Sequence, residues 1–304
     1  MERLGQLAII SNNKPNMEHL ASERYTRHTI LKEVGEKGQE IICNAKVLVV
    51  GAGGLGSPAL LYLCAAGVGT IGILDDDIVS ESNLQRQILY DSNSVGQPKV
   101  EVASRKLQAL NPMCEIFAMQ KRLTASNADD IIANYDVVVD ATDNLLSRYT
   151  INDACIHTGK PFVYGSICEF EGQVSAFNYK DGPNYRDLYP YHKDVADFRQ
   201  PLGVIGALPG VTGSIQASET IKIILDRQDT LSGKLLLIDL LKGTFHTFKI
   251  NKNNYMRLTS MKKLQKRLII TGITLGALSK FLINPKLEGK LDTGKWYKVS
   301  PDGG

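Results

Sequence analysis

The sequence predicts an α/β fold with a doubly wound, mainly parallel sheet and an antiparallel extension on its C-terminal side. The first indication is an alternation of short apolar runs and helically spaced segments between residues 45 and 167. The second is the glycine-rich turn 51–56, which separates the first apolar run from the helical segment after it. The third is the apolar patterning of 171–179 and 233–250, which is typical of antiparallel strands.

The expected elements follow in chain order. Segment 22–42 is predicted as one helix that Ser22 can cap, because apolar residues recur along it. Short apolar runs predict buried strands in 45–51, 70–77, 114–120, 136–144 and 161–167. Helices are expected between them in 57–68, 99–112, 127–135 and 145–159. The second half is predicted to hold a strand in 171–179, a long polar loop in 182–203, a helix in 213–226 and a hairpin in 233–250.

Composition and charge argue against several classes of protein. The 304 residues are 43% hydrophobic and 22% charged, which is typical of a globular protein, and the net charge of +3 does not indicate a nucleic-acid partner. The N-terminus shows no signal-peptide pattern, and the apolar run 268–283 is interrupted by Lys280 and too short for a membrane span. The five cysteines form no C-x-x-C pair, so we expect a cytoplasmic protein without a disulfide framework.

The pattern divides the chain into three regions. Residues 1–20 are a polar N-terminal lead, and 21–252 carry the alternating elements of the main domain. Residues 253–304 lose the periodic pattern, and their role is not assigned; they end in Gly303 and Gly304. We therefore expect the chemistry to lie in 21–252.

The glycine turn is the first candidate for ligand binding. Gly51, Gly53, Gly54 and Gly56 let the backbone approach a phosphate, and the following helix offers free amide donors at its N-terminus. A purely structural turn is the alternative, but the place between strand and helix favours a nucleotide site on a Rossmann-like sheet. Asp75 ends the next strand, where a carboxylate can accept hydrogen bonds from ribose hydroxyls. Its alternative roles are a helix cap or a solvated loop.

Basic residues after the turn indicate which nucleotide binds. A dinucleotide cofactor presents a pyrophosphate that the turn amides can largely neutralise, whereas a triphosphate usually needs Arg, Lys and a metal ion. Arg86 in "NLQRQ" and Lys99 after "VGQP" therefore favour a triphosphate, although each alone is typical of a solvated surface charge. Asp140 and Asp143 end another strand at the same predicted edge, and Asp143 can hold Mg²⁺ or cap the helix that begins near Leu145.

Several motifs, in their order along the chain, resemble those of the MoeB/ThiF/HesA family of adenylyltransferases, which are similar to ubiquitin-activating enzymes. They are "RYTRHTIL", "VLVVGAGGLGSPAL", "NLQRQ", "VGQPKVEVA", "DATDN", "EGQVSAFNY" and "GVIGALPGVTGSIQASETIK", and the resemblance covers about residues 20 to 252. It implies a homodimeric enzyme that binds ATP and Mg²⁺. It also implies that the enzyme adenylates the C-terminal carboxylate of a small ubiquitin-like sulfur carrier, or of a peptide, often one ending in Gly-Gly.

The resemblance implies a role for each matching residue. Asp75 would bind the ribose, Arg86 and Lys99 the triphosphate, and Asp143 the metal ion. Arg27 matches an arginine that reaches the ATP of the other subunit across the homodimer. The remaining candidates of the nucleotide pocket are Gly51, Gly53, Gly54, Gly56, Asp77, Asn83 and Gln87.

The chain departs from the family pattern at two places. Members usually hold a structural zinc with two C-x-x-C pairs, but the first pair is replaced by Asn184 and Asp187 and the second, near "NKNNYMRL", is missing. We therefore predict no zinc. Many members also carry a cysteine before "GVIGALPG", at about Arg199 here, and no cysteine occurs in 169–304. Cys168 is expected to be a buried structural cysteine, and whether Arg199 replaces any function of the missing thiol is left open.

The sequence thus predicts an ATP-dependent adenylyltransferase that forms an acyl-adenylate, releases pyrophosphate and makes no thioester. The alternative is a binding module that holds nucleotide or carrier on the same fold without turnover. An NAD oxidoreductase fits least, because the second half offers no proton relay for hydride chemistry and Arg86 favours a triphosphate.

Overall fold

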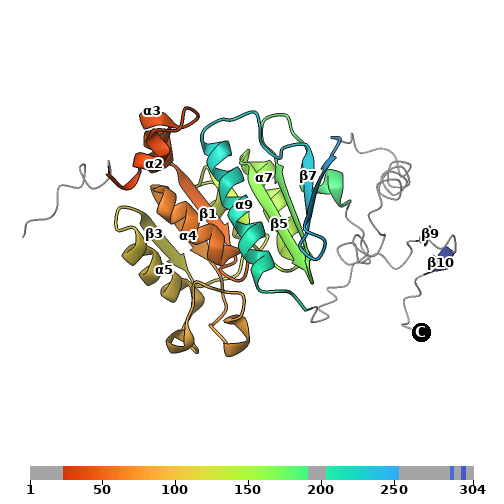
Figure 1. The fold of residues 1–304 in the computed structure, drawn as a ribbon, viewed down its shortest axis with the longest axis horizontal. Coiled ribbons are helices and arrows are strands. Elements are labelled where there is room, and N and C mark those ends of the chain that lie inside the picture. Colours follow the sequence, from red (N-terminus) through yellow and green to blue (C-terminus); the bar gives the residue numbers. More distant parts are fainter. Residues whose placement is uncertain (1–22, 191–202, 253–287, 291–295, 299–304) are drawn as a thin grey trace, which may run out of the picture.

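The computed structural model describes residues 23–190, 203–252, 288–290 and 296–298. An eight-stranded sheet runs through the molecule in the order β3-β2-β1-β4-β5-β6-β7-β8 (Figure 1). Strands β1 to β5 pair with one another in parallel. Strand β6 pairs antiparallel with β5, and β7 and β8 continue antiparallel. This confirms the predicted parallel sheet with an antiparallel extension. The strands are β1 (Lys46–Val50), β2 (Thr70–Leu74), β3 (Glu115–Met119), β4 (Val137–Asp140), β5 (Phe162–Cys168), β6 (Glu171–Phe177), β7 (Lys234–Asp239) and β8 (Thr244–Lys249).

Helices cover both faces of this sheet because successive strand residues point to opposite sides. Val47 and Val49 of β1 pack in one apolar cluster with α4 (Gly56–Ala66) and α5 (Lys99–Leu110). Leu48 and Val50 pack on the other side with α6 (Ala128–Ile132), α7 (Leu145–Thr158) and α8 (Tyr185–Leu188). Helix α9 (Ala207–Ile224) lies beside α4, across the parallel and antiparallel halves (Figure 1).

The remaining described elements are short. Two 3-10 turns, η1 (Glu81–Asn83) and η2 (Ser92–Ser94), lie in the connection from β2 to α5. Strands β9 (Glu288–Lys290) and β10 (Trp296–Lys298) pair antiparallel with each other. None of the helices in the described ranges combines the length and apolar character needed to cross a membrane.

The prediction of one helix in 22–42 is wrong. The chain forms α2 (Thr26–Thr29), turns, and starts again as α3 (Gly35–Asn44). Gly35 adopts φ +62°, a conformation that favours glycine and interrupts the helix. Ile30, which the prediction places in a buried helical stripe, is 67% exposed in the intervening turn. Ser22, the predicted cap, lies outside the described residues.

Two predictions in the second half also need correction. Helix α9 begins at Ala207 rather than near residue 213, because Pro209 is tolerated in a first turn and Gly213 allows close packing. A Cβ atom at Gly213 would collide with the Leu55 carbonyl oxygen, so this glycine lets α9 approach α4. The expected polar loop 182–203 contains α8, and its residues 191–202 lie outside the described part.

Candidate active site

The glycine turn follows the carboxyl end of β1 and packs against the backbone that follows the neighbouring β4. Gly51 adopts φ +93°, and a Cβ atom there would lie 2.7 Å from the Ala141 carbonyl oxygen. A Cβ atom at Gly56 would collide with the carbonyl oxygen of Gly51. Both positions therefore require glycine, and the turn packs directly on the backbone that leads to Asp143. This geometry supports the predicted approach of backbone to a ligand.

Asp75 ties the turn to the end of β2. Its carboxylate is buried and accepts hydrogen bonds from the Ala52 amide (Oδ2, 2.7 Å) and the Asp77 amide (Oδ1, 2.8 Å). Burial raises the pKa of Asp75, and the nearby Lys99 ammonium opposes that rise. The buried Tyr90 hydroxyl donates to the Ala52 carbonyl oxygen at 2.7 Å, so this side chain also holds the glycine turn in place. No sequence pattern distinguishes Tyr90 from an ordinary buried tyrosine.

Lys99 is buried at the first position of α5, so the view of it as a solvated surface charge is wrong. Its side chain is 6% exposed, and Nζ lies 2.9 Å from Oδ2 of Asp77, whose side chain is 65% exposed. The Lys99 amide also donates to the Asp77 carbonyl oxygen at 3.0 Å. An ammonium paired with one carboxylate keeps two further N–H donors. The predicted cation thus lies close to Asp75 and is held in place.

The "NLQRQ" segment supplies two side chains beside the turn. A Cβ atom added to Gly54 would lie 3.8 Å from Arg86 Cγ. The Arg86 Nη1 donates to the Ser82 carbonyl oxygen at 2.9 Å. The Gln87 amide lies 3.5 Å from a Cβ placed on Gly53. Its Oε1 is buried, and no hydrogen-bond partner for that oxygen occurs among the described residues. Both side chains therefore lie near the turn, and their role in binding a nucleotide stays a prediction.

Asn83 has a local role. Its Oδ1 accepts a hydrogen bond from the Ser80 amide at 3.3 Å and completes a capping box on η1. A capping asparagine can still present its Nδ2 donor to a ligand. The structure thus gives Asn83 a structural contact that the sequence prediction did not include.

Asp140 and Asp143 follow the same strand but differ in environment. Asp140 is completely buried, which raises its pKa, and its Oδ1 accepts hydrogen bonds from the Thr142 amide (3.0 Å) and hydroxyl (2.6 Å). Asp143 is exposed. Asn144, rather than Asp143, caps α7 by accepting from the Ser147 amide at 2.9 Å. The capping alternative for Asp143 is therefore wrong, and this carboxylate remains available to a ligand.

Oxygen donors at this edge fit a hard cation such as Mg²⁺. Within the described ranges, Asn144 Nδ2 donates to Asp143 Oδ1 over a long distance of 3.4 Å. The carboxylates of Asp75, Asp76 and Asp77 also lie within 4.8 Å of one another. These three are engaged by backbone amides, by Arg122 (3.2 Å) and by Lys99, respectively, so Asp143 is the better candidate.

Arg27 lies apart from the turn. It is exposed on α2, two residues after Tyr25, whose ring contacts Gly67 at the C-terminal end of α4. The turn lies at the opposite end of this 11-residue helix, about 16 Å away at 1.5 Å per residue. The structure therefore does not bring Arg27 to the turn of its own chain.

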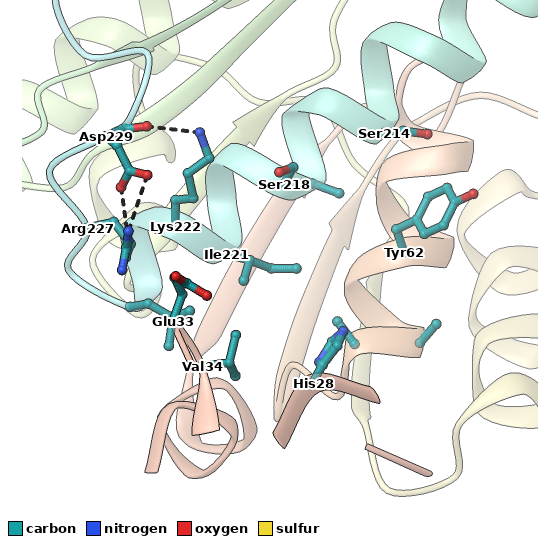
Figure 2. A pocket seen from close by; sticks show the side chains of 14 residues that line it. His28, Glu33, Val34, Tyr62, Ser214, Ser218, Ile221, Lys222, Arg227 and Asp229 are labelled. Atoms are coloured by element: carbon teal, nitrogen blue, oxygen red, sulfur yellow. Dashed lines mark hydrogen bonds and ion pairs between the residues drawn. The ribbon is translucent and has the colours of Figure 1, made fainter. Parts of the chain in front are cut away.

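A groove of about 500 Å³ lies beside α2, between α4 and α9. Figure 2 shows His28 and Tyr62 on one side of it and Ile221 and Lys222 of α9 on the other. Tyr62 is 59% exposed. This groove is separate from the glycine turn and shares none of the predicted nucleotide residues.

The residues at the departures from the family pattern have ordinary structural contacts. Asn184 and Asp187 form a capping box on α8: the Arg186 amide donates to Asn184 Oδ1 at 2.8 Å, and the Asn184 amide donates to Asp187 Oδ2 at 2.9 Å. Cys168 is buried at the end of β5, which confirms its prediction. Arg199 lies outside the described residues.

Comparisons with known proteins point to one family. Residues 25–258 match the ThiF family. A probable molybdopterin-synthase adenylyltransferase of Porphyra purpurea is 44% identical over 252 residues, which make up 81% of this chain and 65% of that protein. This chain thus spans just under two thirds of that relative. A sulfur carrier protein adenylyltransferase of Thermus thermophilus is 46% identical over 240 residues, 76% of this chain and 88% of that protein.

Solved structures share the fold. Escherichia coli MccB, crystallised with ATP, superposes with a TM-score of 0.68 at 20% identity over 78% of this chain and 74% of that one. PaaA superposes with a TM-score of 0.66 at 20% identity over 82% and 79%. Since the family match covers most of the chain and agrees with the predicted motifs, the chain belongs to the ThiF family.

Proposed function

We propose that the protein is an ATP- and Mg²⁺-dependent adenylyltransferase that activates the C-terminal carboxylate of a small ubiquitin-like carrier protein or of a peptide. The enzyme class follows from relatives that are named adenylyltransferases at 44 to 46% identity. The observation that carries the proposal is the buried Lys99 beside the glycine turn, with the exposed Asp143 carboxylate at the same edge. A cation and a metal ligand together suit a triphosphate rather than a dinucleotide.

The nucleotide would lie along the carboxyl edge of β1, β2 and β4. Backbone amides of the turn and the N-terminus of α4 would bind its phosphates, and Asp75 at the end of β2 would accept hydrogen bonds from the ribose. Arg86 and Lys99 supply positive charge, and Gln87 Oε1, which has no partner among the described residues, can accept a hydrogen bond from the ligand. Asp143 would hold Mg²⁺, which neutralises phosphate charge when it is bound.

Adenylation needs positioning and charge rather than a protein nucleophile. An oxygen of the substrate carboxylate attacks the α-phosphorus of ATP and forms the acyl-adenylate. The bond from that phosphorus to the β-phosphate bridging oxygen breaks, and the electron pair leaves with pyrophosphate. Lys99 and Arg86 act by stabilising the charge on the phosphates during this displacement.

The acceptor of the activated acyl group is proposed to lie outside this chain. No cysteine occurs in 169–304, so we propose that no thioester forms on the crossover loop. The acyl-adenylate would then pass to an external nucleophile, such as sulfide, an amine or another protein. We further propose that no zinc is held, since Asn184 and Asp187 stand where ligand cysteines are expected. All five cysteines are free thiols, which favours the cytoplasm.

The proposal is tested by ATP–pyrophosphate exchange with candidate carriers and short peptides. We expect exchange with a carrier that ends in a free Gly-Gly carboxylate and none with the same carrier carrying a C-terminal amide. The amide replaces one carboxylate oxygen by NH2 and removes the negative charge, while the rest of the carrier is unchanged, so it controls for carrier binding. Tight ATP binding without exchange across the panel would instead support the alternative of a binding module.

Arg27 is proposed to act on the nucleotide of a partner copy in a homodimer. Its distance from its own turn supports this, and the exposed Tyr62 and the groove beside α2 offer a surface for that copy. We expect Arg27→Ala and Asp143→Ala each to lose exchange activity as pure dimers.

Co-expression of the two variants tests that arrangement. Hybrid dimers have one site with both residues and one with neither, so an equal mixture should recover about a quarter of wild-type exchange activity. The double variant Arg27→Ala/Asp143→Ala, mixed with wild type, controls for subunit exchange. A mixture that stays as inactive as the pure variants would place Arg27 outside the partner's site.

A further inference from the structure

Two buried ionisable residues, Asp140 and Arg148, hold the backbone that precedes Asp143. Asp140 Oδ1 accepts hydrogen bonds from the amide and the hydroxyl of Thr142, at 3.0 and 2.6 Å. Arg148, in the first turns of α7, donates from Nη2 to the Thr142 carbonyl oxygen at 3.1 Å. All three hydrogen-bonding groups of Thr142 are thus held by these two side chains. We name Asp140, Thr142 and Arg148 the Thr142 clamp.

The clamp is itself fixed by its surroundings. All three residues are buried, and the Arg148 guanidinium lies 5.3 Å from the centre of the Tyr164 ring. Gln216 of α9 donates from Nε2 to the Asp140 carbonyl oxygen at 2.8 Å. Within the described residues, Asp140 Oδ2 and Arg148 Nε have no hydrogen-bond partner. Burying such groups costs free energy, so their presence near the end of β4 indicates a functional role.

Asp143 gains little direction from its own contacts. Its side chain is exposed, and the Asn144 amide approaches it only at 3.4 Å. Its direction must therefore come from the backbone, which the clamp fixes one residue earlier. The Ala141 carbonyl on the other side of Thr142 packs on Gly51, so the clamp also sets Asp143 relative to the glycine turn.

We propose that Asp140 and Arg148 are positioning residues for adenylation, acting through Thr142 to fix the direction of the Asp143 carboxylate toward its metal ion. This inference rests on the proposed function, in which Asp143 holds Mg²⁺. Outer-shell groups that orient a metal ligand typically change metal affinity when they are replaced. The clamp is a candidate for that role because it acts on the ligand's own backbone.

Thr142→Val tests the clamp because it removes one hydroxyl and keeps the side-chain shape. We expect the Mg²⁺ concentration for half-maximal exchange to rise about tenfold, and Mn²⁺ binding to protein loaded with a non-hydrolysable ATP analogue to weaken equally. Thr142→Ser restores the hydroxyl and should restore both. Thr150→Val is the matched control on α7, since its hydroxyl only donates to the Leu146 carbonyl oxygen at 2.9 Å. It should leave both unchanged.

Arg148→Lys serves as a second variant, because it keeps the charge but loses the planar donor fork. It should shift the Mg²⁺ and Mn²⁺ dependences in the same direction. If Thr142→Val and Arg148→Lys fold and keep wild-type metal dependence while Asp143→Ala loses it, the clamp is refuted and the proposed function survives. If Asp143→Ala keeps wild-type metal dependence, the proposed Mg²⁺ role of Asp143 is overturned together with the clamp.

Discussion

Asp143→Ala is expected to lower ATP–pyrophosphate exchange by about 10² to 10³-fold, the range for losing one charge-stabilising group in an active site. The loss should be in kcat and in the Mg²⁺ dependence, because the carboxylate is proposed to hold the metal ion against the phosphates. Stability should change by less than about 0.5 kcal/mol, since Asp143 is exposed and Asn144 caps α7. Exchange kinetics over a Mg²⁺ series, with a thermal melt, measure both.

Asp76→Ala is the matched control for that experiment. Asp76 is another exposed aspartate at the same edge of the sheet, where it pairs with Arg122 at 3.2 Å. Exposed ion pairs contribute little free energy, so its loss should leave exchange within about twofold. Equal losses in Asp76→Ala and Asp143→Ala would mean that negative charge at the edge, rather than one ligand, supports the reaction.

Lys99→Met is expected to reduce kcat/KM for ATP by about 10² to 10³-fold, because it removes a preorganised cation from beside the proposed phosphate site. Methionine fills a similar apolar volume, and Asp77 stays hydrated because its side chain is 65% exposed. The fold should therefore survive the change. Steady-state exchange kinetics and ATP titration calorimetry measure the loss, and circular dichroism checks the fold.

Lys106→Met is the matched control for Lys99→Met. Lys106 lies on the same helix and also pairs with one aspartate, Asp91, at 2.6 Å, but its side chain is 36% exposed. We expect no more than about a twofold effect on kcat/KM, as for an exposed ion pair. If Lys99→Met melts early yet turns over ATP normally, the role of Lys99 is to hold the β2–α5 connection and not the triphosphate.

The sheet and the glycine turn could be predicted because their signals are local. Each buried parallel strand is a continuous apolar run, and Gly51 and Gly56 occupy positions where a side chain would collide. The break before Gly35 could not be predicted, since Ile30 fits a helical stripe until tertiary packing leaves it exposed. The early start of α9 was hidden for a similar reason, because its glycine serves contact with Leu55 across 158 residues of chain.

The candidate site was predictable in residue type but not in environment. The sequence places Lys99 and Asp143 near the turn, yet it does not show that Lys99 is buried or that Asn144 takes the capping role. Those outcomes depend on which of several neighbouring polar groups the packing selects. Tyr90 and the Thr142 clamp had no signal at all, because their contacts join segments that no local pattern connects.

The way α9 packs also fixes when the candidate nucleotide site can form during synthesis. Pro209 lies against Gly54, Gly213 against Leu55, and Gln216 donates to the Asp140 carbonyl oxygen across a sequence separation of 76 residues. These contacts come from the last long helix of the described domain, which ends at Ile224. A nascent chain must therefore emerge from the ribosome beyond that helix before its glycine turn is fully supported, so the proposed ATP binding would report a completed domain rather than its first half.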